Sequence, residues 1–376
     1  AALGAPLLGE RTAPVVVKQA ALLSRAWRVL HGGDPRYAAA LAAPAPAPGP
    51  LPGLKHRDVY IVFFESYGTV VLDEPRYAAV VGPALQRFAA TVTGAGWHLV
   101  SSRIVSPTFG GGSWLAHGTI DSGVKLDPLL DDIITGTARQ TLPRYMHAAG
   151  YRTVEIMPGL KTPEAGHAFW GFDRTVKADD FHYKGPAFGW FGIPDQYTLR
   201  YVAEGEAAPG HPPLFAQIVL VSSHTPFAPV PPYISDWSAR DLYGGLPDAE
   251  WRRIRAAPDW SHLERPYLDS VVYDLETMGA WLAHMPGDAL VVILGDHQPP
   301  GLVADQRAPW TVPIHVLSRD PDLLRPFRAL GYVEGPVPPR QGPFKGMESF
   351  LGDYLGGFSK PAAAAAVLPA AEHGTD

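Results

Sequence analysis

Short apolar runs alternate with longer amphipathic stretches along most of the chain. The clearest apolar runs are VYIVFF (59–64), TVEIM (153–157), FAQIVLV (215–221), ALVVILG (289–295) and VPIHVL (312–317). Their length and β-branched content predict buried strands. Helical spacing predicts helices at 82–93, 113–122, 140–149 and 266–285. This alternation favours an α/β fold with a mostly parallel central sheet sandwiched by helices.

Composition shifts divide the chain into regions. Residues 1–42 are predicted to form a helical lead-in, and the Pro/Ala-rich segment 43–55 an extended connector. Residues 56–357 then form the main domain, and the Ala-rich segment 358–376 a surface tail. Within the main domain, residues 177–196 are rich in aromatic residues and glycine, and we expect them to form a loop beside the functional site.

Composition excludes several classes of protein. A chain of 376 residues with 46% hydrophobic content can bury a large core, and a net charge of -6 argues against a nucleic-acid partner. The absence of cysteine excludes disulfides and thiolate chemistry, and it suits an oxidising compartment. No apolar run reaches the roughly 18 residues of a membrane span. The chain begins at Ala1 rather than Met, so a removed upstream anchor stays an open alternative.

Three predicted strands run directly into polar residues. VYIVFF leads into Glu65, FAQIVLV into SSHTPF with His224, and ALVVILG into Asp296 and His297. In open α/β sheets ligands bind beyond the carboxyl ends of the strands. We therefore expect these side chains to lie along one rim.

Glu65 and the pair formed by Asp296 and His297 are candidate metal ligands. A carboxylate after an apolar strand needs a cation or strong donors, although Glu65 could instead cap a helix or pair with an arginine. Adjacent oxygen and nitrogen ligands suit Zn²⁺ or Mn²⁺. The alternative for Asp296 is a turn closed by the following prolines.

The segment SPTFGGGSWLAHGT places a glycine loop before a predicted helix that begins at Ser113. A hydroxyl and free backbone N–H groups at a helix N-terminus favour an anion. Ser113 is therefore a candidate nucleophile, but the same pattern fits an N-cap residue. Thr108 is the competing nucleophile. His117, four residues after Ser113, shares its helix face and is a candidate substrate contact or a packing residue.

The ordered motifs VFFESYG, GGGSWLAHGT, SSHTPF and GDHQ resemble the alkaline phosphatase and sulfatase superfamily. The resemblance covers most of residues 56–317 and is strongest to the single-metal bacterial envelope branch, which includes lipoteichoic acid synthase and phosphoethanolamine transferases. It implies a sulfatase-type catalytic domain. It also implies one divalent metal held by Glu65, Ser113, Asp296 and His297, with His224 contacting substrate.

Departures from the family narrow this expectation. The loop MPGLKTPEAGH (157–167) lacks the Trp and Arg of lipoteichoic acid synthases, so Lys161 is the candidate cation there. Without cysteine, the formylglycine mechanism of ordinary sulfatases is disfavoured. Ligands for a second metal are not evident.

The predicted function is metal-dependent phospho-transfer or phosphoester hydrolysis on an envelope lipid or glycan, through a phospho-serine at Ser113. The alternatives are a sulfate-ester hydrolase and a non-catalytic module that binds anionic glycans. Trp190 and its aromatic neighbours are candidates for cradling the substrate, or for ordinary loop packing. The expected location is periplasmic or extracytoplasmic, with membrane association through an upstream anchor.

Overall fold

A mixed sheet forms the centre of the computed structural model, which describes residues 42, 47–162, 166–239 and 241–360. Its eight strands lie in the order β4-β3-β5-β1-β6-β7-β2-β8. The run from β4 to β6 is parallel, whereas β7, β2 and β8 join through antiparallel pairs. The strands are β1 Asp58–Phe64, β2 His98–Val105, β3 Arg152–Met157, β4 Arg174–Lys177, β5 Leu214–Val219, β6 Ala289–Gly295, β7 Thr311–Ser318 and β8 Val333–Glu334.

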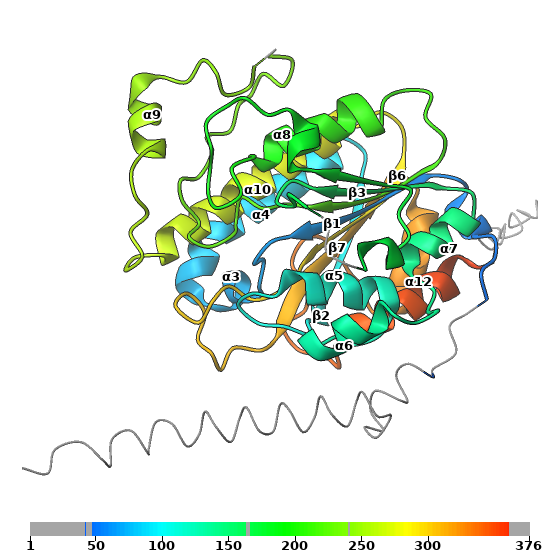
Figure 1. Cartoon of the computed structure of the whole chain (residues 1–376). Coiled ribbons are helices and arrows are strands. Elements are labelled where there is room, and N and C mark those ends of the chain that lie inside the picture. Colours follow the sequence, from blue (N-terminus) through cyan, green and yellow to red (C-terminus); the bar gives the residue numbers. More distant parts are fainter. Residues whose placement is uncertain (1–41, 43–46, 163–165, 240, 361–376) are drawn as a thin grey trace, which may run out of the picture.

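Helices cover both faces of the sheet (Figure 1). One face packs against α3 Val70–Asp73, α4 Pro75–Gly94, α8 Asp195–Tyr201 and α10 Glu264–His284. The other packs against α5 Ser113–Ser122, α7 Leu142–Ala148, α11 Arg325–Ala329 and α12 Phe350–Phe358, while α6 Pro128–Ile134 packs beside α5. Helix α9 Asp248–Ile254 lies outside these two layers and has no buried residue.

Alternation along β1 explains why its sequence is apolar from Val59 to Phe64. Tyr60 and Val62 point into the core beneath α4 and α10, whereas Ile61 and Phe63 point into the core beneath α5 and α12. Successive side chains of a strand face opposite sides, so a strand covered on both faces needs no polar position. This is the sequence pattern from which the α/β fold was predicted.

The sequence prediction of a mostly parallel sheet between helices is confirmed, with differences at the edge. All five predicted strands are present, and α5 has the predicted bounds 113–122. Helix α4 begins earlier than predicted, because Pro75 occupies its first turn. Strand β2 was not predicted, since Ser101, Ser102 and Arg103 interrupt its apolar run.

The predicted terminal regions fall largely outside the described residues. The lead-in is described at residue 42 alone, and the tail only as far as residue 360. Within the predicted connector, Leu51 and Leu54 are buried against the core. The first residue of the predicted tail, Phe358, ends α12 and is also buried. Among the described helices, none has the length and apolar character to cross a membrane.

Candidate active site

The register of the sheet brings the ends of β1 and β6 together. The two strands are parallel neighbours, and Phe64 pairs with Gly295. The residues that follow these two strands are Glu65 and Asp296, so both carboxylates lie at the same rim of the sheet. Strand β5 lies on the other side of β1 and delivers His224 to this rim. The strand-end prediction for these residues is therefore matched by their positions.

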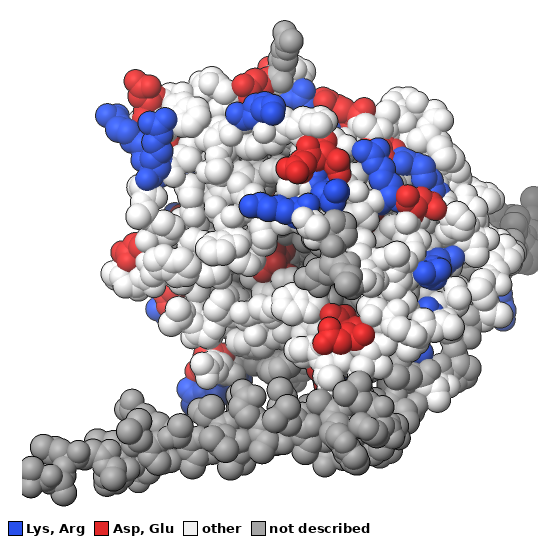
Figure 2. All heavy atoms as spheres, in the orientation of Figure 1, with Lys and Arg blue, Asp and Glu red and all other residues white. Residues whose placement is uncertain are grey.

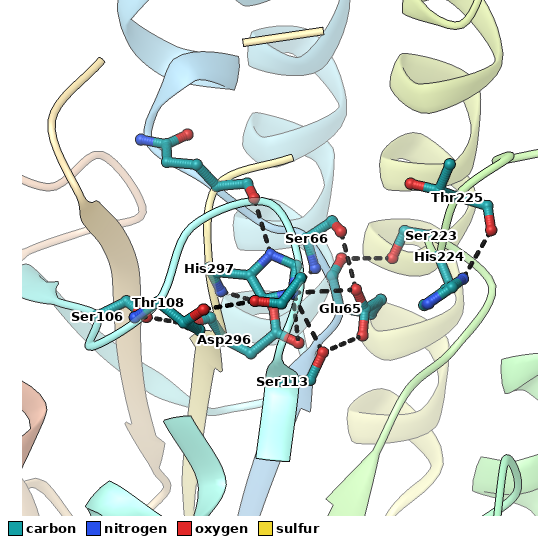
Figure 3. Close-up of polar contacts among 12 residues, drawn as sticks. Glu65, Ser66, Ser106, Thr108, Ser113, Ser223, His224, Thr225, Asp296 and His297 are labelled. Carbon is teal, nitrogen blue, oxygen red and sulfur yellow. Dashed lines mark hydrogen bonds and ion pairs between the residues drawn. The ribbon is translucent and has the colours of Figure 1, made fainter. Parts of the chain in front are cut away.

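Glu65, Asp296 and His297 form a compact group of potential metal ligands. One ligand atom from each lies within 4.8 Å of the others, and all three residues are buried. The Nε2 atom of His297 is 3.5 Å from Oε1 of Glu65 and 3.8 Å from Oδ2 of Asp296. Figure 3 shows these side chains converging on one point with Ser113. Among the described residues, this is the one such group of three or more.

Backbone contacts fix the orientation of the ligand atoms. His297 Nδ1 donates to the carbonyl of Gln298 at 2.7 Å, which leaves the lone pair of Nε2 free to bind a metal. Oδ1 of Asp296 accepts from the backbone N–H groups of Ser66 at 2.8 Å and His297 at 2.6 Å. Oδ2 of Asp296 is buried and has no hydrogen-bond partner. A buried carboxylate oxygen without a partner is costly, so the donor set fits a divalent cation.

Electrostatics supports the same conclusion. Burial, followed by repulsion from Glu65, raises the pKa of Asp296 to about 6. Burial alone would lower the pKa of His297, but the carboxylates of Asp296 and Glu65 outweigh it and raise that pKa. Both shifts report an excess of negative charge, and a divalent cation at these atoms would lower both pKa values.

A glycine loop places Ser113 beside the ligand group. Gly110, Gly111 and Gly112 have φ values of +69°, +143° and +79°, a backbone path that other residues rarely adopt. Helix α5 starts at Ser113, with Gly112 at the N-cap position. The Ser113 hydroxyl donates to Oε2 of Glu65 at 2.9 Å and lies 3.1 Å from Nε2 of His297.

These contacts bear on the alternatives left by the sequence. Ser113 is not the N-cap residue, because Gly112 holds that position. Thr108, the competing nucleophile, donates its hydroxyl to the carbonyl of Gly111 at 2.5 Å instead of to the ligand group. Among the described residues, the Glu65 carboxylate contacts Ser66, Ser113 and His297, and none of these is an arginine.

His224 lies beside the ligand group with one ring nitrogen available. Its Nδ1 donates to the carbonyl of Thr225 at 2.7 Å, so Nε2 is the acceptor nitrogen. Burial lowers the pKa of His224, which favours the neutral ring. The ring of Phe191 packs at 4.9 Å between centroids, and that of Trp190 lies at 6.3 Å with 65% of the residue exposed.

The remaining candidates occupy different positions. His117 is buried, stacks against Phe63 with ring centroids 4.1 Å apart, and has no partner for Nε2. Burial lowers the pKa of His117 to about 4. Lys161 is exposed and does not line the pocket, although its neighbour Leu160 does. Its predicted contact with substrate stays a prediction.

A pocket of about 700 Å³ opens beside Ser113. Ser113, Glu65 and His224 lie at one side of it, and the pocket continues between α5 and the ends of β3 and β5. Figure 2 shows acidic atoms recessed in a hollow on this face of the molecule. The site therefore joins a ligand group for a cation to a cavity large enough for a substrate.

Sequence reasoning missed several residues that shape the site. The Ser223 hydroxyl donates to the carbonyl of Glu65 at 2.8 Å, and Ser66 holds Asp296 through its backbone N–H. Asp121, Glu155 and Gln217 line the far end of the pocket. The spacing of Ser113, His117 and Asp121 by four residues on one helix was a signal that could have found Asp121.

No protein-family model matches the chain, and no curated protein matches its sequence. Its structure, however, is similar to solved structures. The lipoteichoic acid synthase LtaP of Listeria monocytogenes has 14% sequence identity and a TM-score of 0.53, covering 83% of this chain and 74% of that one. The C-terminal periplasmic domain of EcEptC from Escherichia coli has 13% identity and a TM-score of 0.50, covering 83% and 86%.

A third similar structure is the integral membrane lipooligosaccharide phosphoethanolamine transferase A of Neisseria meningitidis. It has 14% identity and a TM-score of 0.50, covering 85% of this chain and 57% of that chain. The three likenesses confirm the resemblance drawn from the motifs at the level of the fold.

Proposed function

We propose that this chain is a metal-dependent enzyme that transfers or hydrolyses phosphate esters through a phospho-serine at Ser113. The observation that carries the proposal is the position of the Ser113 hydroxyl, within hydrogen-bond distance of two of the three ligand side chains. A nucleophile and a ligand group are the two parts that such chemistry needs. The fold shared with a lipoteichoic acid synthase and phosphoethanolamine transferases supports phosphorus as the reacting element.

Glu65, Asp296 and His297 would hold the cation, with Ser113 beside them. When bound, a divalent cation such as Zn²⁺ or Mn²⁺ supplies charge that lowers the pKa of the serine hydroxyl and neutralises the phosphoryl oxygens. Oε2 of Glu65 accepts a hydrogen bond from the Ser113 hydroxyl. This contact would orient Oγ for attack on the substrate. The free N–H groups at the start of α5 favour the developing negative charge.

The reaction then proceeds in two displacements. The Ser113 hydroxyl gives its proton to solvent as Oγ forms a bond to phosphorus. The ester oxygen of the first alcohol leaves with the bonding electrons and takes up a proton from solvent. A second acceptor, either water or an alcohol, next displaces Ser113 from phosphorus. The neutral Nε2 of His224 is suited to accept the proton of that second acceptor. Water as acceptor gives hydrolysis, and a hydroxyl of a lipid or glycan gives transfer.

The substrate class and location belong to the same proposal. The pocket beside Ser113 has room for part of a phosphorylated lipid or glycan. The exposed indole of Trp190 stands near His224, where it would contact the rest of such a substrate. The periplasmic domain of EcEptC shares the fold, which supports an extracytoplasmic site of action.

The test compares two hydroxyl variants of the metal-loaded protein on bis(p-nitrophenyl) phosphate. Ser113→Ala should lower turnover by on the order of 10³-fold or more and leave metal content unchanged. Thr108→Ala is the control for the competing hydroxyl. It loses one hydrogen bond to the glycine loop, so its turnover should fall by no more than about tenfold. Equal activity of Ser113→Ala and wild type overturns the proposal. An aryl sulfate assayed in parallel should react more slowly, and faster sulfate turnover would assign the chain to sulfate esters.

A further inference from the structure

The far end of the pocket carries polar side chains that the proposed chemistry does not use. Asp121 comes from α5, Glu155 from β3 and Gln217 from β5. Asp121 is 2% exposed and Gln217 is 1% exposed, so both are buried in the wall of the cavity. Buried polar groups with no catalytic or packing role call for a ligand.

Two oxygen atoms in this wall lack partners. Oδ1 of Asp121 and Oε1 of Gln217 are buried without any hydrogen bond. Burial and repulsion from Glu155 raise the pKa of Asp121 well above its ordinary range, against the opposing effect of a hydrogen bond from Gln217. Both orphaned atoms are acceptors, so what the wall lacks is hydrogen-bond donors and positive charge.

The lining of the whole pocket also carries more negative than positive side chains. Its carboxylates are Glu65, Asp121, Asp131, Asp132 and Glu155, and no lysine or arginine is among the described residues that line it. Aromatic rings of Trp114, Trp170 and Phe191 also line the cavity. Carboxylates together with aromatic faces are the surroundings that attract an organic cation.

A bare metal ion fits this end of the pocket less well. Oε2 of Glu155 already contacts Nε2 of His167 at 2.9 Å and accepts from Thr175 at 3.0 Å. In the described part of the chain, the ligand atoms of Asp121, Glu155 and His167 do not come close enough to form a second metal group. A primary ammonium group has three donors and can satisfy separated acceptors, whereas a hydroxyl has one.

Helix α5 sets the distance between the two ends of the site. Ser113 is its first residue, and Asp121 lies eight residues further on the same face, after His117. At a rise of 1.5 Å per residue the two positions are about 12 Å apart along the axis. A two-carbon amino alcohol links phosphorus to nitrogen by four bonds of roughly 1.5 Å, less than about 6 Å in all. A longer arm is needed to reach Asp121 from a phosphoryl group at Ser113.

We infer that Asp121 and Gln217 form a subsite for a primary ammonium group of the substrate, carried on an arm longer than two carbons from the reacting phosphorus. The inference rests on the proposed function, because the phosphoryl group at Ser113 fixes the other end of the substrate. It makes Asp121 the residue that selects an amine-bearing phosphodiester over a neutral one of the same length.

The turnover test uses p-nitrophenyl phosphodiesters with alkyl arms of two or six carbons, each ending in an ammonium or a hydroxyl group. For the metal-loaded enzyme, kcat/KM should favour the six-carbon ammonium over its hydroxyl partner by about tenfold or more, the effect of one charge-assisted hydrogen bond. The two-carbon pair should show a much smaller ratio. Asp121→Asn should reduce the six-carbon ratio to near one. Asp248→Asn, which removes an exposed carboxylate away from the pocket, should keep it.

A binding test separates this inference from the proposed function. Ser113→Ala is titrated with 6-aminohexyl phosphate and with 6-hydroxyhexyl phosphate, followed by tryptophan fluorescence of the pocket. Tighter binding of the amine that is lost in Ser113→Ala/Asp121→Asn supports the subsite, even if the wild-type chain turns over no ester. If turnover depends on Ser113 but the ammonium and hydroxyl substrates have equal kcat/KM values, the subsite is overturned. The proposed function then stands. If Asp121→Asn does not fold, the wild-type enzyme decides the question. A kcat/KM ratio of ammonium to hydroxyl substrate that is larger for six carbons than for two supports the subsite, and equal ratios at both lengths overturn it.

Discussion

Oε2 of Glu65 accepts a hydrogen bond from Oγ of Ser113 at 2.9 Å, although 48 residues separate the two along the chain. The end of β1 and the start of α5 meet at this contact. Because Glu65 also contacts His297, the hydroxyl is held at the edge of the ligand group (Figure 3). This single relationship links the metal prediction to the nucleophile prediction.

Metal binding should stabilise the protein through Asp296. Zn²⁺ or Mn²⁺ at 100 times its Kd should raise the free energy of unfolding by about 2.7 kcal/mol, because the cation pairs with the orphaned Oδ2 atom. Thermal melting with and without chelator measures the effect. Asp296→Asn should abolish the metal-dependent shift, whereas Asp132→Asn should keep it. Equal melting temperatures of the loaded and chelated wild type would count against the metal site.

The sequence predicted for a definite physical reason that the side chains of the ligand group would lie at one rim. Glu65, Asp296 and His297 each follow a strand whose apolar run is visible in the sequence, and adjacent parallel strands bring their ends to one rim. The antiparallel edge could not be foreseen in the same way. Strand β2 buries polar residues that interrupt its apolar pattern. The pairing of β7 with β6 depends on a loop whose path the pattern does not specify.

The glycine loop should matter through the position of Ser113. Gly112→Ala places a Cβ atom 3.0 Å from Oγ1 of Thr108 at a φ of +79°. We expect a loss of stability of about 1–2 kcal/mol from the left-handed conformation, together with a fall in kcat of about tenfold or more as the nucleophile shifts.

A second glycine provides the control. Gly96 has a φ of +86° with open space around its Cβ position and lies away from the pocket. Gly96→Ala should therefore cost similar stability and keep its turnover. Equal kcat values for the two variants, measured at matched folded fractions, would show that the loop does not position Ser113.

His315 should make the protein less stable in acid. Its Nδ1 donates to Ser101, whose hydroxyl is committed to the carbonyl of Gly335, and its Nε2 accepts from Tyr67. The neutral ring is therefore fully satisfied, and burial lowers the pKa of His315 to about 4. Its contribution to stability is complete above the unfolded pKa of about 6.5 and is lost as the pH falls from there toward 4.

The measurement is the free energy of unfolding by urea across this pH range. Protonation of the unfolded chain alone should remove about 1.4 kcal/mol per pH unit, or roughly 3 kcal/mol by pH 4. In His315→Gln the free energy of unfolding should fall less steeply with decreasing pH, by about 1.4 kcal/mol per pH unit, whatever the variant's absolute stability. Exposed His98 is the matched control, and His98→Gln should leave the slope as it is. An unchanged slope in His315→Gln would contradict a neutral buried ring.

We expect His224 to act on the substrate and not to bind the metal. His224→Gln keeps a polar side chain but removes the nitrogen that can take a proton, so kcat/KM should fall by about 10² to 10⁴-fold. Metal affinity, measured by competition with a chromogenic chelator, should stay within about threefold, since His224 is outside the ligand group. A large loss of metal affinity with unchanged kcat/KM would reassign this histidine as a ligand.

The pocket wall shows why part of the site escaped prediction. Asp121 lies in the last turn of a helix and Gln217 in the middle of a strand, where a single polar residue has many structural explanations. Their meaning depends on α5 packing against β3 and β5, which creates the cavity and leaves two oxygen atoms without partners. Only the four-residue spacing of Ser113, His117 and Asp121 was visible in the sequence.

Locating the phosphoryl group on the protein would test the phospho-serine mechanism most directly. Metal-loaded enzyme is mixed with a p-nitrophenyl phosphodiester, quenched in acid within the first turnovers, digested and mapped by tandem mass spectrometry. We expect a phosphodiester adduct on Ser113 that is absent from Ser113→Ala and retained in Thr108→Ala. An adduct on another residue, or steady turnover by Ser113→Ala with no adduct at all, would contradict it.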